Sequence, residues 1–355
     1  MTITVDIIGA SFAKAAYLPA FATVADVEVV AIASGRMESA QATADAFDIP
    51  NVYDDWEQML EKHPADVVCV VTPTVHHAPM ALAALDRGAH VICEKPFAMN
   101  ADEARRMVEK AESLNRVHLM GHELRFNPNR RKIKQLIADG TIGKVQHVNV
   151  VNIGGGGDPA GRVANTWWAK EEWGGGILGA NGSHQIDLLR FWLGDIGTLT
   201  GQIKTMVPDR IGKDTGEPWT ATADDQVSFT AEMVHGALVS VFLSSAARHG
   251  IGNHVQIFGS EGTIKLSNDD EKLLVARAGE DFQDMSEHDP NADLPGVGKG
   301  IWNVSFVALV QEFTAAIREG RALQAGATFR DGLKGQEAMD AVRQSYAERR
   351  WITLN

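Results

Sequence analysis

Cysteine, aromatic residues and long apolar runs are all scarce in this sequence. Cys69 and Cys93 are its only cysteines, and aromatic residues make up 7% of its 355 residues. Two cysteines in a chain of this length exclude a disulfide-stapled scaffold, and both lie in apolar segments, which indicates buried free thiols and a reducing compartment. No apolar stretch reaches the roughly 20 residues that span a bilayer. The N-terminus has no basic region followed by an apolar segment, so we expect a cytoplasmic protein with no membrane partner.

Positive charge is also in short supply. The 33 Lys and Arg residues face 46 Asp and Glu residues, for a net charge of −13. An acidic surface repels phosphate backbones, which argues against a nucleic-acid partner but leaves room for a local basic pocket that binds one small anion. Hydrophobic residues make up 45% of the chain, enough for a sizeable core, which excludes disorder. The length indicates two domains.

The first third of the chain alternates between short apolar segments and amphipathic ones. Strands are predicted at Ile3–Ile8, Val27–Ala33, Val67–Val71, Ala89–Cys93 and Val117–Met120. Helices are predicted at Ala13–Thr23, Glu38–Phe47, Trp56–Lys62, Ala78–Arg87 and Ala101–Leu114, the last with Asn100 as its N-cap. Apolar strands separated by amphipathic helices are typical of a parallel sheet covered on both faces. We therefore predict a doubly wound α/β domain over residues 1–121.

After Gly121 the strands follow one another with shorter connections. They are predicted at Val145–Ile153, Val227–Val234, Ala237–Ser245, His254–Phe258, Thr263–Leu266 and Lys272–Arg277. His235-Gly236 and Ser260-Glu261-Gly262 are typical hairpin turns. The helices predicted at Ser183–Leu193 and Val304–Arg318 are expected to cover one face of this sheet. Residues 122–355 are thus predicted to form an α+β domain with a large, mostly antiparallel open sheet.

The turn after the first predicted strand is a weak dinucleotide-binding motif. A G-x-G-x-x-G fingerprint would place glycines at positions 9, 11 and 14, but only Gly9 is present. Ser11 is small enough to let the backbone approach a pyrophosphate. Lys14 opposes the helix dipole, a conflict that a bound phosphate would relieve, although Lys14 could equally point into solvent.

The end of the second strand bears on the choice of nucleotide. An NAD site usually has Asp or Glu about twenty residues beyond the glycine turn, whereas this chain has Ser34-Gly35-Arg36. Arg36 could pair with a 2′-phosphate or stack on adenine, which favours NADP over NAD. The alternative is an exposed arginine that begins a helix.

Two further motifs follow predicted strands. Thr72-Pro73-Thr74-Val75-His76-His77 comes after Val67–Val71, and Glu94-Lys95-Pro96 comes after Val91-Ile92-Cys93. In a doubly wound sheet both lie at the carboxyl ends of strands, where ligands bind. Lys95, between an apolar strand and a proline, is therefore a candidate for a positioned cation.

With these motifs the sequence resembles the Gfo/Idh/MocA family of nicotinamide-dependent oxidoreductases over essentially its whole length. The resemblance rests on Leu18-Pro19, Thr72-Pro73 with His77, Glu94-Lys95-Pro96, Arg125-Phe126 with Pro128, and Gly174-Gly175-Gly176 leading to Gly182-Ser183-His184 and Asp187. It implies a Rossmann domain followed by a domain for substrate binding and oligomerisation. Sugars, polyols, inositols or related cyclic alcohols are the expected substrates. Independently, a large sheet with a semi-apolar outer face suggests a homodimer or homotetramer built through the second domain.

The resemblance also implies roles for individual residues. Lys95 and His184 are the expected catalytic residues, with His184 as the acid/base group and the Lys95-Pro96 peptide often cis. The predicted cofactor-binding residues are Gly9, Ser11, Phe12, Ala13, Lys14, Ser34, Arg36, Thr72, Pro73, His77, Glu94 and Lys95. The predicted substrate-binding residues are Lys95, Arg125, Trp168, Asn181 and His184.

The sequence departs from the family at one position of the second domain. The family usually has an aspartate four residues before the histidine, where this chain has Ala180. Without that carboxylate, His184 loses a negative charge that would raise its pKa. Either a different hydroxyl is oxidised, another residue compensates, or alcohol oxidation has been lost; because Lys95 and His184 are both present, we favour the first two.

Other clusters allow less specific interpretations. None of the twelve histidines has a compact metal-ligand spacing, so no metal is expected. Trp167-Trp168, Lys170 and Trp173 could line a sugar site or pack in a core or subunit interface. Two rival functions remain: a glycosidase of related fold that oxidises its sugar transiently with bound NAD, and a non-enzymatic dinucleotide-binding regulator.

Overall fold

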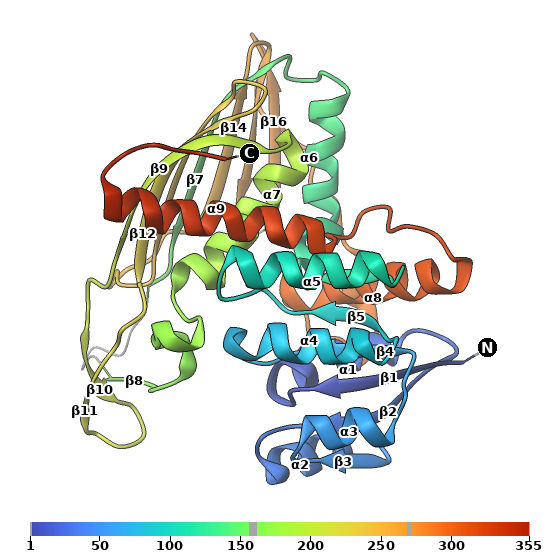
Figure 1. Cartoon of the computed structure of the whole chain (residues 1–355). Coiled ribbons are helices and arrows are strands. Elements are labelled where there is room, and N and C mark those ends of the chain that lie inside the picture. Colours follow the sequence, from blue (N-terminus) through green and yellow to red (C-terminus); the bar gives the residue numbers. More distant parts are fainter. Residues whose placement is uncertain (1, 156–161, 268–270, 355) are drawn as a thin grey trace. The chain divides into compact units, whose positions relative to one another are not determined.

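The structure of the chain, a computed structural model, describes residues 2–155, 162–267 and 271–354 (Figure 1). It divides into two compact units. The first joins Met1–Asn127 with Asp289–Leu333, and the second joins Pro128–His288 with Lys334–Asn355. The segment Asp289–Leu333, near the C-terminus, thus belongs to the same compact unit as the N-terminal residues. The division of function at residue 121, with cofactor binding before it and substrate binding after it, stays a prediction.

The first unit contains a six-stranded sheet in which every pair of neighbours is parallel. Its order is β3-β2-β1-β4-β5-β6, so the chain starts in the middle of the sheet and winds outward in both directions. The strands are β1 (Ile3–Ile8), β2 (Val27–Ala33), β3 (Asn51–Tyr53), β4 (Val67–Val70), β5 (His90–Cys93) and β6 (His118–Met120). The predicted doubly wound Rossmann sheet is confirmed.

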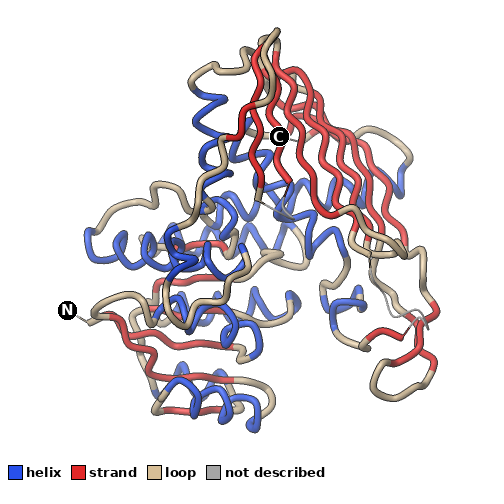
Figure 2. Tube along the Cα trace, turned by 180° about the vertical axis from the view of Figure 1, so that it is seen from behind, coloured by secondary structure: helices blue, strands red, loops and turns tan. Residues whose placement is uncertain are grey.

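Helices cover both faces of this sheet (Figures 1 and 2). They are α1 (Leu18–Phe21), preceded by a π-helical turn (Ala13–Tyr17), α2 (Met37–Phe47), α3 (Trp56–Lys62), α4 (His77–Asp86) and α5 (Ala101–Ser113). The Asn100 side chain accepts a hydrogen bond from the Glu103 N–H at 2.9 Å, so the predicted N-cap is confirmed. One apolar cluster packs α4 and α5 on one face, and a second packs the first helix on the other.

One predicted helix covers a different sheet from the one expected. Helix α8 (Ile301–Glu319) places Phe306, Val310 and Phe313, all fully buried, in the apolar cluster of the first unit. The expectation that Val304–Arg318 covers the sheet of the second unit is therefore wrong. Amphipathic spacing shows that a helix has an apolar face, but it does not show which sheet that face covers.

The second unit contains a nine-stranded sheet, ordered β17-β16-β15-β14-β7-β13-β12-β9-β18. All neighbours are antiparallel except β13 and β7, which are parallel. The strands are β7 (Val145–Ile153), β9 (Ile196–Lys204), β12 (Gln226–Met233), β13 (Leu238–Ser244), β14 (Gly252–Gly259), β15 (Gly262–Ser267), β16 (Lys272–Arg277), β17 (Gln283–Asp284) and β18 (Ile352–Thr353). The predicted large, mostly antiparallel sheet is confirmed.

The remaining elements of the second unit lie on or beside this sheet. Helices α6 (Pro128–Ala138) and α7 (Ser183–Leu193) lie on one face of the strands (Figure 1), while α9 (Phe329–Glu348) starts in the first unit and ends in the second. A small separate sheet joins β8 (Arg162–Val163), β10 (Asp209–Gly212) and β11 (Pro218–Thr220). Along β12, Val227, Phe229, Ala231 and Met233 are buried and alternate with more exposed residues, as the sequence predicts.

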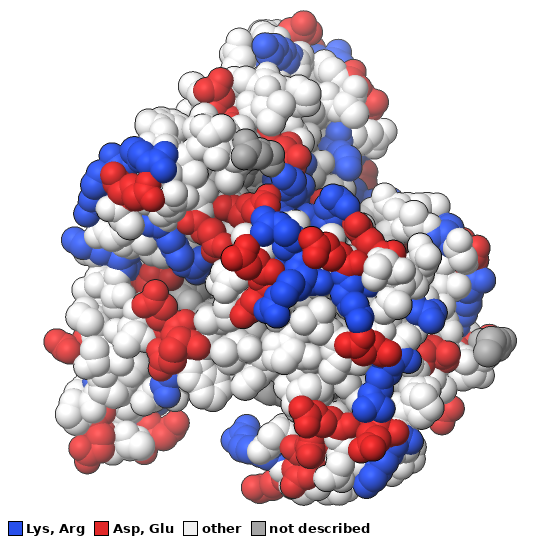
Figure 3. Space-filling model, viewed as in Figure 1, with Lys and Arg blue, Asp and Glu red and all other residues white. Residues whose placement is uncertain are grey.

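The surface charge is mixed in sign. Acidic and basic side chains are interspersed over the face shown in Figure 3. None of the helices in the described segments combines the length and the apolar character that a bilayer span requires.

Candidate active site

Gly9 ends β1 in a conformation and a position that only glycine fits. Its φ is +107°, and its N–H donates to the Ala33 carbonyl oxygen at 2.8 Å. A Cβ on Gly9 would come within 2.0 Å of the Val71 carbonyl oxygen. The glycine therefore lets the turn after β1 pass close to the end of β4, where the next predicted motif begins.

The residues after Gly9 begin the first helix. Ser11, Phe12 and Lys14 are exposed and Ala13 is buried. Ser11 and Lys14 thus lie at the start of a helix that follows a strand, the location at which a dinucleotide phosphate binds in this fold.

This helix contains a π-helical turn just before Pro19. Pro19 has no N–H to offer the Ala15 carbonyl oxygen, which accepts a hydrogen bond from the Asn303 side chain of α8 instead. The turn places Tyr17 at the centre of a ring cluster, with centroids 4.7 Å from Phe306 and 6.3 Å from Phe12. Single π-helical turns are frequent at functional sites.

The end of β2 presents Ser34 and Arg36. The Ser34 N–H donates to the Tyr53 carbonyl oxygen, and Arg36 is the exposed N-cap residue of α2. Within the described part of the chain Arg36 forms no salt bridge. Its guanidinium is therefore available to an anionic group near this end of the sheet.

His77 links the two motifs that follow β4 and β5. Its ring is buried, with Nε2 2.8 Å from the Thr72 carbonyl oxygen and Nδ1 2.9 Å from the Pro96 carbonyl oxygen. Burial lowers the pKa of His77 to about 4, so the ring is neutral at pH 7 and its single N–H donates to one of the two carbonyls. His77 thus ties the turn at Thr72-Pro73 to the turn at Lys95-Pro96.

The Glu94-Lys95-Pro96 turn has a cis peptide bond between Lys95 and Pro96, as the family resemblance implies. Glu94 is buried, and its carboxylate accepts a hydrogen bond from the Tyr17 hydroxyl at 2.7 Å and from the Lys95 N–H at 3.2 Å. Burial raises the pKa of Glu94 to about 6, against the opposing effects of the Lys95 charge and the Tyr17 hydrogen bond. Lys95 itself is half-buried.

The two cysteines are free and buried, as predicted. Burial raises the pKa of both Cys69 and Cys93 well above the ordinary value. Both thiols therefore stay protonated at neutral pH and are poor nucleophiles.

Arg125 lies in a short 3₁₀ helix, Glu123–Phe126, and is buried. Its guanidinium is 3.2 Å from the carboxylate of Asp331, whose other oxygen accepts from the Thr328 N–H and hydroxyl. Arg125, which the sequence predicts to contact substrate, is thus already held in an ion pair with Asp331.

In the second unit, His184 and Asp187 lie in α7 and both are buried. Helix α7 continues directly from a π-helical turn, Leu178–Gly182, which contains half-buried Ala180 and Asn181. The structure therefore brings the predicted catalytic histidine, Asn181 and the divergent alanine together at one helix end.

Asp224 anchors the start of this π-helical turn. Its carboxylate accepts from the Leu178 N–H at 2.8 Å, and its carbonyl oxygen accepts from the Ile177 N–H at 2.9 Å. Gly176, with φ +109°, lies so close that a Cβ there would come within 2.1 Å of the Asp224 carboxylate. A carboxylate at a helix start satisfies free N–H groups and favours the helix dipole, so Asp224 fixes the entry to the His184 helix.

The tryptophans before the glycine run form an exposed cluster. Trp167 and Trp168 stack with ring centroids 4.0 Å apart, and the Lys170 ammonium lies 5.9 Å from the Trp173 ring. Trp168 is 42% exposed and Trp173 is 39% exposed. Core packing therefore does not explain these two rings, while a sugar contact or a subunit contact stays a prediction.

Two family models match most of the chain. The first, described as an oxidoreductase family with an NAD-binding Rossmann fold, matches residues 3–122, and the second, the GFO/IDH/MocA C-terminal domain, matches residues 130–265. The chain belongs to the Gfo/Idh/MocA family. It is accordingly a nicotinamide-dependent oxidoreductase that acts on CH–OH groups.

Characterised relatives of this family member include sugar dehydrogenases. The levoglucosan dehydrogenase of Pseudarthrobacter phenanthrenivorans is 26% identical over 91% of this chain and 88% of its own length. The D-glucoside 3-dehydrogenase of Escherichia coli is 30% identical over 66% of this chain and 68% of its own length. A solved structure of levoglucosan dehydrogenase with NADH and L-sorbose superposes with a TM-score of 0.90, with 26% identity, over 100% of both chains.

Within this family member, four predicted cofactor segments meet at one sheet edge. Gly9, Ser34, Thr72 and Glu94 follow β1, β2, β4 and β5, which are adjacent and parallel. His184, Asn181 and Trp168 belong to the other unit. No group of three or more His, Cys, Asp or Glu side chains within residues 2–155, 162–267 and 271–354 is arranged to hold a metal ion.

Sequence reasoning missed three residues of this Gfo/Idh/MocA site: Tyr17, Asp224 and Asp331. Tyr17 escaped notice because a π-helical turn changes which side chains face the sheet. The Asp224-Asp225 pair directly before β12 was a visible signal, since two acidic residues ahead of a strand are unusual. Nothing local to Asp331 points to its pairing with Arg125.

Proposed function

We propose that this oxidoreductase transfers a hydride between NADP(H) or NAD(H) and a hydroxyl or carbonyl of a sugar, polyol, inositol or related cyclic alcohol. The observation that carries the proposal is the Glu94-Lys95-Pro96 turn, held by Tyr17 and His77 at the sheet edge where Gly9 and Thr72 also end strands. The sugar dehydrogenases among its relatives support the substrate class.

The residues present fit a dinucleotide. Gly9 has no side chain to obstruct a ligand, and it lets the turn after β1 pass close to the end of β4. Ser11 is small and exposed, and the helix N-terminus that follows attracts phosphate. Lys14 adds a positive charge beside those N–H groups. We therefore propose that Gly9, Ser11, Phe12, Ala13 and Lys14 hold the pyrophosphate. Thr72, Pro73, Glu94 and Lys95 would border the nicotinamide half, with His77 fixing their two turns.

In the proposed reaction His184 transfers the proton of the hydroxyl, and Lys95 stabilises the negative charge on its oxygen. A bound nicotinamide would supply the hydride acceptor for oxidation and the hydride donor for reduction. His184 takes the proton of the hydroxyl as the C–H bond breaks and the C=O bond forms, and gives a proton back in reduction. Lys95 donates a hydrogen bond to the same oxygen and stabilises its developing negative charge.

Ala180 bears on which hydroxyl reacts. A carboxylate one turn before His184 would accept a hydrogen bond from a substrate hydroxyl, and this chain has a methyl group there. We propose that the reacting hydroxyl differs from that of family members with aspartate, with Arg125, Trp168 and Asn181 bordering the substrate.

A titration and a substrate panel test this function. NADPH and NADH are titrated by fluorescence, and sugars, polyols and inositols are then screened by the absorbance of reduced nicotinamide. Lys95→Ala and His184→Asn are expected to abolish turnover of any substrate found, while Lys62→Ala, at an exposed position of α3, leaves it unchanged. Turnover of a glycoside without release of reduced cofactor would indicate the glycosidase, and cofactor binding without any turnover would indicate the regulator. Absence of cofactor binding would refute the assignment.

For the cofactor we propose a preference for NADP. Ser34-Gly35-Arg36 contains no carboxylate to hold a ribose 2′-hydroxyl, and the Arg36 guanidinium is exposed. In this fold the residues after the second strand contact the ribose 2′ position, so this segment bears on the preference directly. Arg36→Ala is expected to weaken NADPH binding about tenfold or more and to leave NADH binding within twofold. Equal losses for both would refute the preference.

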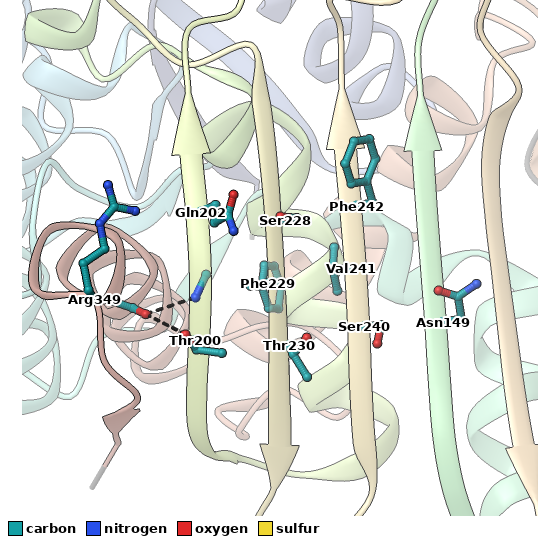
Figure 4. Close-up of a pocket in the computed structure, with 12 residues that line it drawn as sticks. Asn149, Thr200, Gln202, Ser228, Phe229, Thr230, Ser240, Val241, Phe242 and Arg349 are labelled. Carbon is teal, nitrogen blue, oxygen red and sulfur yellow. Dashed lines mark hydrogen bonds between the residues drawn. The ribbon is translucent and has the colours of Figure 1, made fainter.

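We also propose a homodimer or homotetramer built on the open face of the nine-stranded sheet. Thr200, Thr230, Ser240, Asn149 and Gln256 stand opposite one another in register across five strands. Four of them line a hollow of about 480 Å³ (Figure 4). A neutral row of hydroxyls and amides can pair with a second copy of itself without charge repulsion.

The oligomeric state tests this surface directly. Sedimentation at micromolar concentration is expected to show a dimer or larger species, and Ser240→Arg at the centre of the row is expected to release monomers. A wild-type monomer, or a Ser240→Arg variant that sediments as wild type does, would refute the proposal.

We propose the cytoplasm as its location, since Cys69 and Cys93 are both free thiols. Fractionation of the producing cells tests this, and recovery outside the cytoplasm would refute it.

A further inference from the structure

Tyr17 and Glu94 form a buried pair between two parts of the Rossmann unit. Tyr17 lies in the helix that follows the dinucleotide turn, and Glu94 follows β5. Neither side chain is more than 5% exposed, and the hydroxyl donates to the carboxylate at 2.7 Å. A buried carboxylate is costly unless it accepts hydrogen bonds or faces a cation, so this hydrogen bond decides how Glu94 is held.

The other oxygen of Glu94 faces Lys95. It accepts from the Lys95 N–H at 3.2 Å. Gly121 also packs against the carboxylate, since a Cβ there would come within 2.5 Å of it. Glu94 is thus enclosed by Tyr17, Lys95 and Gly121, and it has little freedom to move without moving the Lys95 backbone.

We propose that Tyr17 is a positioning residue for Lys95. Its hydroxyl fixes the Glu94 carboxylate, and the carboxylate fixes the Lys95 backbone and attracts the Lys95 ammonium. The helix that holds the pyrophosphate is thereby connected to the lysine at the nicotinamide end. The inference rests on the role proposed for Lys95.

The groups facing Glu94 allow its protonation to be followed. From the first helix it meets Tyr17, from β4 Cys69, from β5 Cys93, and from its own turn Lys95. Burial raises the pKa of Tyr17 and of both thiols well above their ordinary values, so all three stay neutral. Among these facing groups of the described chain, the Lys95 charge and the Tyr17 hydrogen bond both lower the pKa of Glu94, and a change in the Glu94 titration therefore reports on Tyr17 or Lys95.

Tyr17→Phe is the decisive variant, because it removes the hydroxyl and keeps the ring that packs on Phe306. In the ligand-free protein the Glu94 carboxyl is titrated by carbon-13 NMR, with its signal assigned from Glu94→Gln. The midpoint is expected to rise by about one pH unit. With an identified substrate, the acidic limb of kcat/KM is expected to move by the same amount, and kcat to fall about tenfold.

Tyr53→Phe is the matched control. It also removes a tyrosine hydroxyl bonded to a side chain, His63 at 2.8 Å, and it is expected to leave the Glu94 titration and kcat unchanged. Glu94→Gln serves as the second variant should Tyr17→Phe not fold, and the contribution of Glu94 to the acidic limb should then disappear, leaving that of His184.

The outcomes separate this inference from the proposed function. An unchanged Glu94 midpoint in Tyr17→Phe, or a shifted midpoint with an unchanged kcat/KM profile, would overturn the inference. In Glu94→Gln, an acidic limb identical to that of the wild type would do the same. Full activity of Lys95→Ala would instead refute the role of the lysine, and the shift in the Glu94 titration would still occur.

Discussion

Asp6 is predicted to destabilise the protein at neutral pH. It lies in β1 opposite Ala31 of β2 and Val68 of β4, at 0% exposure. Neither carboxylate oxygen has a hydrogen-bond partner among the residues that the structure describes. Burial without compensation raises the pKa of Asp6 to about 7.

The size and sign of the effect follow from linkage. The unfolded chain binds the proton of Asp6 only below its ordinary pKa of 3.8, whereas the folded chain keeps it up to about pH 7. The contribution of this proton to the free energy of unfolding is therefore fully present at acidic pH and is lost as the pH rises through 7. The whole shift corresponds to about 4 kcal/mol, and the part between pH 5 and pH 8 to about 3 kcal/mol.

Asp6→Asn tests this reasoning, because it keeps the shape and cannot ionise. Urea unfolding of both proteins at pH 5 and pH 8 gives two differences in the free energy of unfolding. The variant is expected to gain about 3 kcal/mol relative to wild type on going from pH 5 to pH 8. Asp54→Asn, at an exposed position of the same unit, is expected to gain nothing. Equal differences at the two pH values for Asp6→Asn would refute the argument.

Three further substitutions test the site. Gly9→Ala, whose Cβ would come within 2.0 Å of the Val71 carbonyl oxygen, should lower the free energy of unfolding by about 2–5 kcal/mol, measured by urea unfolding; a loss below 0.5 kcal/mol would contradict the close approach. Asp224→Ala should cost about 1–3 kcal/mol in the same assay and lower kcat, with Asp224→Asn restoring most of both; equal losses in the two variants would contradict the anchor. Ala180→Asp, which adds a carboxylate before His184, should move the acidic limb of kcat/KM towards higher pH; an unchanged profile would contradict their proximity.

Most strands of the Rossmann sheet could be predicted because their residues are largely apolar. Mostly apolar segments placed β1 and β2 at the residues where the structure has them, Ile3–Ile8 and Val27–Ala33. The edge strand β3, Asn51–Tyr53, was missed because three residues are too few to show a periodic pattern of apolar side chains. In the second unit β9 was missed: its sequence mixes two Thr and two Gly residues with three apolar ones, so little apolar pattern marks it.

The candidate site was predictable in its motifs and not in its contacts. Strand ends locate Gly9, Thr72 and Lys95 at one edge, because carboxyl ends of parallel strands meet there. The roles of Tyr17 and Asp224 depend on side chains that meet across 77 and 46 residues of sequence. No local pattern encodes such pairings.

Asp6 and Glu94 together show what the Tyr17 hydroxyl contributes. Both carboxyls are buried in the same parallel sheet region, one within β1 and one after β5. With no partner among the described residues, Asp6 has its pKa raised from 3.8 to about 7. Glu94, with a hydroxyl donor, a backbone donor and a cation, has its pKa raised only from 4.5 to about 6. Burial raises the pKa of both carboxyls, and the Lys95 charge and Tyr17 hydrogen bond lower that of Glu94 again. Removing the Tyr17 hydroxyl should therefore bring the titration of Glu94 closer to that of Asp6.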